Sequence, residues 1–503
     1  MLLFWLGVAI LLLGYWTYGK FVEAVVAPDD RATPAEAMYD GVDFVPLPHW
    51  KNMLIQLLNI AGVGPVIGVI LGIKFGVVAF LIIPIGNIIG GAVHDFVSGM
   101  FSLRNRGCNL PAQIRMTLGR VYYVFFAFFM SLLLLLVVTT FVNVPAQLID
   151  KEFLPQVSFF WCAVGVIFLY YIFATLFPVD KIIGKIYPFF GAMLLLGTGM
   201  LCCSLVYNNL TTPEDFLTET EAFRAQIPNQ GPIIPCLFVT IACGILSGFH
   251  ATQSPIIART MKTERQAYSS FYGMMVVEGL IAMIWAAGAL AVYHHFPEYL
   301  TKGGTETLGK ITQYFLGGWM GTATVLAVVV LAITSGDTAL RSLRLSLSEI
   351  FHIDQRALGR RLIVSIPLVV IVTGLLWWSN KDAAAFGVLW NYFAWGNQVL
   401  AASTLMGCSV WLMANQRCFW ITYVPGLFMT FVVLTFILWT APDRGGPIGF
   451  GFGLETSYLI AGAISFVLGV LTLLRGRRML KEGRTMMISL DCPNTQKTKD
   501  FVS

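Results

Sequence analysis

The sequence is short of charged residues. Asp, Glu, Lys and Arg make up 12% of its 503 residues, whereas a soluble domain averages about 25%. Hydrophobic residues make up 57% and the mean hydropathy is +0.75. This composition excludes an ordinary soluble domain and predicts an integral membrane protein made of α-helical spans. The net charge of +5 gives no reason to expect a nucleic-acid partner, because most basic residues fall in loops expected to face the cytoplasm.

Motifs of several enzyme classes are also missing. There is no Gly-x-x-x-x-Gly-Lys-Ser/Thr loop and no soluble segment large enough for an ATPase, so transport energy would come from an ion gradient. The nine cysteines include no Cys-x-x-Cys pair, and no His-Glu-x-x-His occurs. We therefore expect no cofactor, no metal site and no catalytic residue. A membrane-embedded metalloenzyme built on His94, His250 and Glu278 is the less favoured alternative.

Apolar segments of membrane-spanning length recur along the chain and predict thirteen spans. The first segment has no basic region before it and is interpreted as a retained span. The predicted spans are 2–19, 52–73, 76–103, 119–143, 156–177, 187–207, 232–258, 267–293, 311–339, 361–379, 383–413, 418–440 and 455–474.

The distribution of Lys and Arg predicts how these spans are oriented. The loop that holds Arg104, Arg106, Arg115 and Arg120 has no acidic residue, so it should be cytoplasmic. If successive loops lie on alternate sides of the membrane, starting from this cytoplasmic loop, 25 of the 32 Lys and Arg residues fall on the cytoplasmic side. We expect a multi-pass protein of the cytoplasmic membrane with its N-terminus outside and its C-terminus inside.

Two of the predicted spans carry a break. In the segment from 232 to 258, Gly248 is a plausible end for one half-helix, and Ser254 with Pro255 is typical of the start of another. Residues 249–253 would then be unwound, with His250 in the middle. A matching break, residues 61–65, lies in the span from 52 to 73. Unwound backbone at membrane depth is tolerated only in protein or beside a wet cavity, and in transporters it marks the substrate site.

The positions of the two breaks indicate an inverted repeat. Residues 52–207 and 232–413 each contain five spans, an odd number, and each opens with a broken helix, so the second unit would be inserted upside-down relative to the first. The remaining parts are an extra N-terminal span with a cytoplasmic loop, an outer loop, two C-terminal spans and a cytoplasmic tail. Their limits are 1–51, 208–231, 414–474 and 475–503.

Five motifs carry a resemblance to a known family. They begin at Asp40 (Asp-Gly-Val-Asp-Phe-Val-Pro), at Asn59 (Asn-Ile-Ala-Gly-Val-Gly-Pro-Val-Ile-Gly), at Gly90 (Gly-Gly-Ala-Val-His-Asp-Phe), at Ser247 (Ser-Gly-Phe-His-Ala) and at Thr334 (Thr-Ser-Gly-Asp-Thr). The chain resembles the carbon starvation protein A (CstA) family of peptide transporters. The resemblance implies a LeuT-type fold and a secondary transporter of the inner membrane that takes up peptides, and in some members pyruvate, during nutrient limitation.

The candidate substrate-binding residues lie at the two breaks and on the eleventh span. Half-helix N-termini present free N–H groups that suit a carboxylate, and His250 could contact substrate, carry a proton or only satisfy loose carbonyls. Asn391, Trp395 and Gln398 share one helix face, which would line a peptide cavity or join helices. The predicted substrate site is Gly62, Gly64, Phe249, His250, Thr252, Ser254, Asn391 and Gln398.

The candidate coupling residues are the acids, histidines and hydroxyls inside the spans: His94, Asp95, Glu278, Thr334, Ser335 and Asp337. Adjacent helical residues point to different faces, so His94 and Asp95 are not expected to form one face-to-face pair. They would mark a pathway or relay, or form a buried, hydrogen-bonded pair that locks helices together. Asp337 is four residues before Arg341, a spacing that favours an ion pair. Hydroxyls with a carboxylate also suit Na⁺, so the driving ion is proton or sodium, with proton favoured. A pyruvate or other small-carboxylate symporter is the main alternative to a peptide importer.

Overall fold

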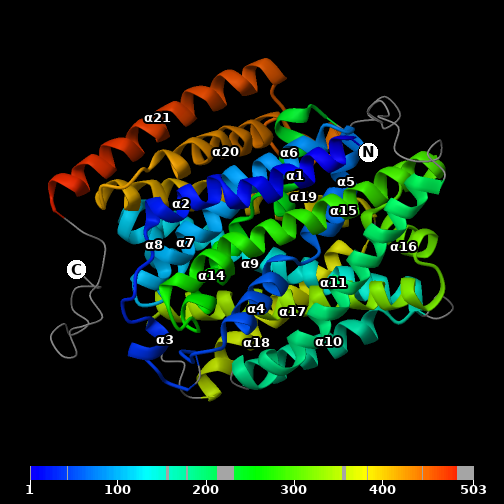
Figure 1. The fold of residues 1–503 in the computed structure, drawn as a ribbon, viewed down its shortest axis with the longest axis horizontal. Helices are drawn as coiled ribbons and strands as arrows, with labels where there is room; N and C mark the ends of the chain where they lie inside the picture. The colour runs from blue at the N-terminus through cyan, green and yellow to red at the C-terminus, as the bar shows by residue number, and fades with distance from the viewer. Residues whose placement is uncertain are drawn as a thin grey trace.

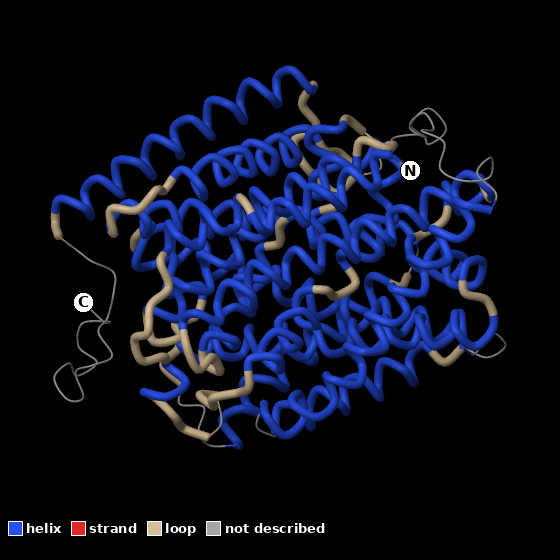
Figure 2. Tube along the Cα trace, in the orientation of Figure 1, coloured by secondary structure: helices blue, strands red, loops and turns tan. Residues whose placement is uncertain are grey.

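The computed structural model describes residues 2–41, 43–153, 158–176, 179–211, 231–353, 358–381, 383–444 and 446–483. Its ordered elements in these ranges are helices (Figure 2). Most of the predicted outer loop at 208–231 and the tail beyond residue 483 lie outside the described residues. The limits of the two repeats are therefore still a prediction.

The first part of the chain forms an N-terminal helix pair, a short helix and the first predicted five-span unit. The pair is α1 (Leu2–Trp16) and α2 (Tyr18–Val26), followed by α3 (Pro34–Ala37). The unit contains α4 (His49–Ile60), η1 (Gly64–Gly68), α5 (Val69–Gly72), η2 (Ile73–Phe75), α6 (Ala79–Gly86), η3 (Asn87–Gly91), α7 (Ala92–Arg104), α8 (Leu110–Leu118), α9 (Arg120–Leu148), η4 (Ile149–Phe153), α10 (Phe160–Leu176) and α11 (Val179–Thr211).

The second part forms the other unit and two C-terminal helices. The unit contains η7 (Ile233–Leu237), α12 (Phe238–Thr240), α13 (Ala242–Ile245), α14 (Gly248–Ala258), η8 (Glu264–Gln266), η9 (Tyr268–Gly273), α15 (Met274–His295), η10 (Pro297–Thr301), α16 (Gly304–Phe315), α17 (Gly318–Ile350), α18 (Leu358–Ser379) and α19 (Ala383–Ala414). The chain continues with α20 (Trp420–Trp439), η11 (Pro442–Arg444) and α21 (Leu454–Lys481).

Each of the thirteen predicted spans overlaps one of these helices or a run of consecutive ones. The ninth, 311–339, has the wrong limits, because it begins in α16 and stops short of the end of α17 at Ile350. Among the described residues, nine helices are long and apolar enough to cross a membrane, and the bent pair His49–Ile60 and Gly64–Phe75 makes a tenth. The other three predicted spans fall on α10, on the interrupted segment from η7 to α14, and on α19. These three are short, broken or relatively polar, which is why length and hydropathy alone do not select them.

The helices lie side by side in one bundle (Figure 1). Helices α15 and α17 are mostly buried, whereas α1 and α21 keep most of their surface exposed, as membrane-facing helices do. The N-terminal helix α1 packs on α6 and α15, and α20 packs between α19 and α21. Helix α16 lies at one end of the bundle and α8 at the opposite end. The broken helices are therefore surrounded by other helices.

A buried ion pair holds the N-terminal connector against the end that carries α8. The Glu264 carboxylate is fully buried and accepts hydrogen bonds from Arg104 Nη2 at 2.9 Å and from the Asp29 backbone N–H at 3.1 Å. Arg104 also donates to the carbonyl of Ala27 at 2.7 Å. Hydrogen bonds from Arg31 lower the pKa of Asp29 to about 2, so this loop carboxylate stays charged at physiological pH.

We expect Arg104→Met to lower the free energy of unfolding by up to about 3–5 kcal/mol, because the Glu264 carboxylate would lose its buried partner. It would keep only Arg31, whose Nε lies 3.5 Å away in a partly exposed position. The matched control is Arg265→Met, since Arg265 pairs with Asp30 at 2.5 Å in an exposed position, where an ion pair contributes little to stability. Thermal unfolding of the purified protein in detergent measures both. Equal shifts for the two variants would contradict this account of the ion pair.

Candidate functional site

The first break separates α4 from η1. Residues 61–63 are not helical, and the two half-helices meet at an angle of 52°. Pro65 has no N–H to continue the hydrogen bonding of α4. The carbonyl of Leu58, near the end of α4, accepts a hydrogen bond from Ser335 Oγ of α17 at 3.1 Å. The break is therefore located where the sequence predicts it, and a candidate coupling residue satisfies its loose backbone.

The second break is two residues long and lies earlier than predicted. Leu246 (φ −170°, ψ 115°) and Ser247 (φ −126°, ψ 120°) are extended, and α14 begins at Gly248. The prediction that residues 249–253 are unwound is wrong, as is the prediction that a half-helix starts at Ser254. His250 instead lies in the first turn of α14. Ser254 lies inside the helix, where its Oγ donates to the carbonyl of His250 at 3.1 Å.

Helix α19 explains why the second break lies at residues 246–247. Asn397 Oδ1 accepts the Phe249 backbone N–H at 2.7 Å, and Asn397 Nδ2 donates to Ser247 Oγ at 2.9 Å. Gln398 Nε2 donates to the carbonyl of Leu246 at 2.9 Å. These side chains supply the partners that the broken helix lacks. Sequence reasoning missed Asn397; an amide beside Gln398 in an apolar helix was the available signal.

The two broken helices touch each other closely. A Cβ at Gly64 would lie 2.2 Å from the Cβ of Cys243, so only glycine fits there. Close approach through small residues is the usual way in which membrane helices pack. Gly62, on the same break, faces Phe141 and Ser335. The first and second breaks therefore form one continuous region in the middle of the bundle.

Four buried titratable side chains line up beside this region. Asp95 accepts from His94 Nδ1 at 2.8 Å through Oδ1 and from His250 Nδ1 at 3.0 Å through Oδ2. The far nitrogen of His250, Nε2, lies 3.8 Å from Glu278 Oε1. All four side chains are buried. The expectation that His94 and Asp95 form no face-to-face pair is wrong, and the two side chains are the buried, hydrogen-bonded pair that the alternative describes.

This set, which we call the His–Asp–Glu chain (His94, Asp95, His250 and Glu278), joins three helices. Asp95 and His94 come from α7, His250 from α14 and Glu278 from α15. His94 Nε2, His250 Nε2 and both Glu278 oxygens have no hydrogen-bond partner within the described residues. Because burying charge is costly, such a chain favours states in which its members share protons. It is chemically able to hold and pass a proton next to the second break.

The hydroxyls and the acid predicted on α17 have different surroundings. Ser335 contacts the first break, whereas Thr334 Oγ1 donates to Leu331 of its own helix at 2.9 Å. Asp337 is buried, and Arg341 acts on it only as a nearby charge, so the direct ion pair that the spacing favours does not form. Arg341 donates instead to the carbonyl of Ala174 at 2.9 Å. A backbone carbonyl of α10 therefore takes the guanidinium hydrogen bond that an ion pair with Asp337 would use.

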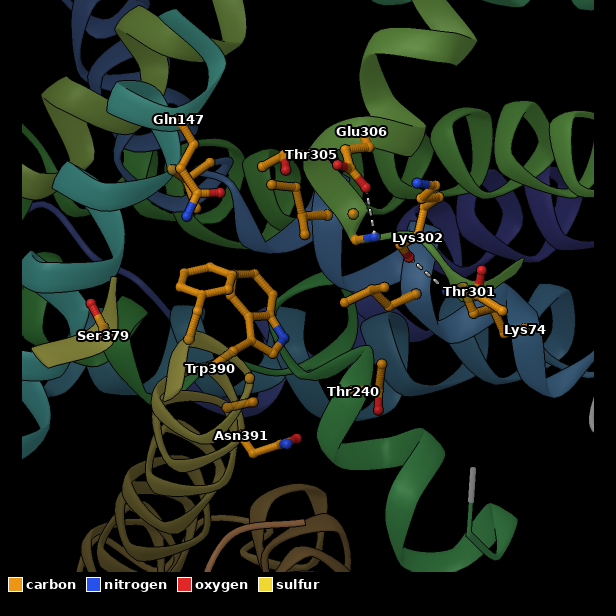
Figure 3. A pocket seen from close by; sticks show the side chains of 18 of the residues that line it. Lys74, Gln147, Thr240, Thr301, Lys302, Thr305, Glu306, Ser379, Trp390 and Asn391 are labelled. Atoms are coloured by element: carbon orange, nitrogen blue, oxygen red, sulfur yellow. Dashed lines mark hydrogen bonds between the residues drawn. The ribbon is translucent and has the colours of Figure 1, made fainter. Parts of the chain in front are cut away.

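The remaining predicted substrate residues are divided between a cavity and the core. A cavity of about 930 Å³ lies at the end of the bundle that carries α16, and Asn391 and Trp390 line it (Figure 3). Gln398 does not line it, because it is held at the second break. Thr252 is also buried, and its Oγ1 donates to the carbonyl of Phe249 at 2.7 Å. We call this cavity the vestibule.

Charged groups of both signs surround the vestibule. Lys151 Nζ and Glu306 Oε1 form an ion pair at 3.2 Å across its rim, and Asp150 and Lys302 also line it. Lys74 donates to the carbonyl of Leu300 at 2.7 Å, which joins the first broken helix to η10. The vestibule therefore offers both cationic and anionic partners to a ligand.

An aromatic layer lies between the vestibule and the His–Asp–Glu chain. Trp390 lines the vestibule and packs on Phe393, with ring centroids 5.5 Å apart. Phe393 contacts Phe141 at 6.0 Å, and Phe141 contacts Phe249 at 5.7 Å. Phe249 directly precedes His250. Trp390, Phe393, Phe141 and Phe249 therefore form a continuous row of ring contacts from the vestibule to the residue before His250.

No group of three or more His, Cys, Asp or Glu residues in the described part of the chain has an arrangement that could hold a metal ion. The metalloenzyme alternative therefore has no ligand set within those residues.

Solved structures with the same fold are membrane transporters. The chain matches a manganese transporter of Eremococcus coleocola, in complex with an aromatic bis-isothiourea substituted compound, with a TM-score of 0.56, 13% identity and coverage of 88% of this chain and 99% of that chain. It matches MhsT in complex with L-phenylalanine with a TM-score of 0.55, 12% identity and coverage of 86% and 99%. These likenesses show that the chain has an all-helical fold of the LeuT type.

The sequence comparisons give the family. The model of carbon starvation protein CstA matches residues 1–167, 160–313 and 297–436, and the chain therefore belongs to the CstA family. It is 41% identical over 343 residues to an uncharacterized membrane protein of Haemophilus influenzae, and this alignment covers 59% of this chain and 92% of that protein. It is 24% identical over 557 residues to the peptide transporter CstA of Escherichia coli, and this alignment covers 85% of this chain and 79% of that protein.

We expect Asn397→Leu to lower the free energy of unfolding by about 1–3 kcal/mol, because the Phe249 N–H would lose its partner. Asn391→Leu, on the same helix but at the vestibule, is the matched control and should have little effect. Hydrogen–deuterium exchange at residues 246–250 would report the local opening of the break. Unchanged protection there in Asn397→Leu would count against the capping role.

Proposed function

We propose that this protein is a secondary active transporter that imports peptides across the cytoplasmic membrane, coupled to protons and working by alternating access. In this proposal its N-terminus lies outside and its C-terminus in the cytoplasm, as the Lys and Arg distribution predicts. The observation that carries the proposal is the His–Asp–Glu chain beside the second break. It combines proton-binding groups with the helix discontinuity at which transporters of this type bind substrate.

The vestibule supports a peptide as the substrate. With about 930 Å³ it is roomier than a three-carbon acid requires. A peptide carries a positive and a negative end, and the rim provides carboxylates at Asp150 and Glu306 and ammonium groups at Lys151 and Lys302. The half-helix N-termini at Gly64 and Gly248 add positive dipole ends for a carboxylate deeper in the protein. Pyruvate has the carboxylate but no amino end.

Alternating access would require the cytoplasmic side to open. Here α14 is held to α17, because Ser342 Oγ donates to the carbonyl of Thr252 at 2.7 Å. Nearer the cytoplasm, Arg259 donates to Asn109 at 3.0 Å and Asn109 donates to Glu349 at 2.6 Å. The vestibule lies at the opposite, outer end. We propose that substrate passes the aromatic layer, that protonation of the chain accompanies its binding, and that these cytoplasmic contacts then separate.

The first test is uptake into liposomes that contain the purified protein. We expect a labelled dipeptide to accumulate under an inward proton gradient and not under a sodium gradient. Labelled pyruvate is the second substrate in the same assay. Accumulation of pyruvate alone would replace the peptide proposal with a small-carboxylate symporter. Accumulation that follows only the sodium gradient would move the coupling site from the His–Asp–Glu chain to the oxygens around Ser335.

The second test is on the proton-binding groups. We expect His250→Ala to reduce proton-driven uptake by about a hundredfold, within the range by which a positioned proton carrier acts. Glu278→Gln cannot release a proton, so it should lose driven accumulation but retain exchange of labelled for unlabelled substrate. The matched control is His294→Ala, at the exposed end of α15, which should leave uptake unchanged. Normal accumulation by His250→Ala would refute the assignment.

A further inference from the structure

A second cavity lies on the side of the bundle that carries the C-terminal helices. It has a volume of about 550 Å³, and α9, α19, α20 and α21 line it together with Leu118 of α8. Its floor is formed by buried residues of α19 such as Ala402 and Met406, whereas Phe125 and Leu471 on its rims are exposed. The cavity is therefore a groove that opens on the membrane-facing surface. We call it the C-terminal groove.

The polar atoms of the C-terminal groove are already occupied. Tyr122 OH is hydrogen-bonded to Ser403 Oγ at 2.7 Å, and Trp395 Nε1 donates to the carbonyl of Val433 at 2.9 Å. The hydroxyls of Thr430 and Thr472 donate to carbonyls of their own helices at 2.7 and 2.9 Å. The groove between its ends therefore presents an apolar wall. Such a wall suits a hydrocarbon chain and does not suit a peptide or a sugar.

One end of the groove is basic. Arg475 lines it and donates through Nε to the carbonyl of Thr117 at 3.1 Å. Its Nη2 lies 3.8 Å from the position of a Cβ at Gly119, and Arg120 follows directly on the exposed start of α9. No acidic residue occurs between residues 104 and 120. At the end of α21, the Glu482 carboxylate forms an ion pair with Arg478, whose Nε lies 2.7 Å from Glu482 Oε1.

We propose that the C-terminal groove binds an anionic phospholipid of the cytoplasmic leaflet, with one acyl chain between α9 and α21 and its phosphate group at Arg475 and Arg120. An apolar channel between spans that ends in arginines, which form no ion pair within the described residues, matches both parts of such a lipid. The lysine and arginine distribution places this end of the helices on the cytoplasmic side, where anionic lipid is available. A zwitterionic lipid would fill the groove equally well but would gain less at its basic end.

The test uses the purified full-length chain and native mass spectrometry, with phosphatidylglycerol and phosphatidylethanolamine of identical acyl chains as probes. We expect phosphatidylglycerol to be retained preferentially. Arg475→Gln should weaken its binding about fivefold, which corresponds to about 1 kcal/mol for one basic group near the membrane surface. The matched control is Arg477→Gln, which removes the same charge from the same helix but does not line the groove.

A second variant tests the apolar part independently of charge. Ala402→Leu adds bulk to the floor of the groove, so it should reduce the retention of both lipids while the melting temperature confirms folding. Equal retention of the two lipids by the natural sequence would overturn the proposal. So would equal losses in Arg475→Gln and Arg477→Gln, or full retention in Ala402→Leu. If Arg475→Gln does not fold, Arg120→Gln provides the charge test.

Discussion

A helix that breaks inside a membrane leaves backbone N–H and carbonyl groups without partners, and the rest of this structure depends on supplying them. At the second break Asn397 accepts the Phe249 N–H and Gln398 donates to the carbonyl of Leu246. At the first, Ser335 donates to Leu58. The partners come from α17 and α19, which are far from the breaks in sequence. The breaks are therefore stable only in the assembled bundle.

The same arrangement explains where charge can be buried. Asp95 is fully buried, yet each of its oxygens accepts a hydrogen bond from a histidine. His250 reaches it only because α14 restarts at Gly248, which places residue 250 in the first turn of the half-helix. A break at residues 249–253 would leave that ring on irregular backbone. The geometry of the His–Asp–Glu chain therefore depends on the position of the break.

The sequence was sufficient for the features that depend on composition and local chemistry. Long apolar runs locate the helices, and Gly62, Gly64 and Pro65 identify the first break. The second break was misplaced because Ser254 and Pro255 look like a helix start, and only the contact with Asn397 decides otherwise. The side chains of His94 and Asp95 pair despite being adjacent, and Arg341 bonds to Ala174 rather than Asp337. Such outcomes depend on neighbouring helices, which local spacing does not specify.

The contact between the breaks gives a physical reason for the proposed coupling. Gly64 of the first broken helix lies against Cys243, three residues before the extended pair at Leu246 and Ser247. A displacement of either half-helix must therefore shift the other. Any shift of α14 moves His250 relative to Asp95 on α7 and Glu278 on α15, and so changes the cost of each protonation state in a region without water-like screening. In the proposed mechanism, proton occupancy and the position of α14 would then be linked in both directions, as thermodynamic coupling requires.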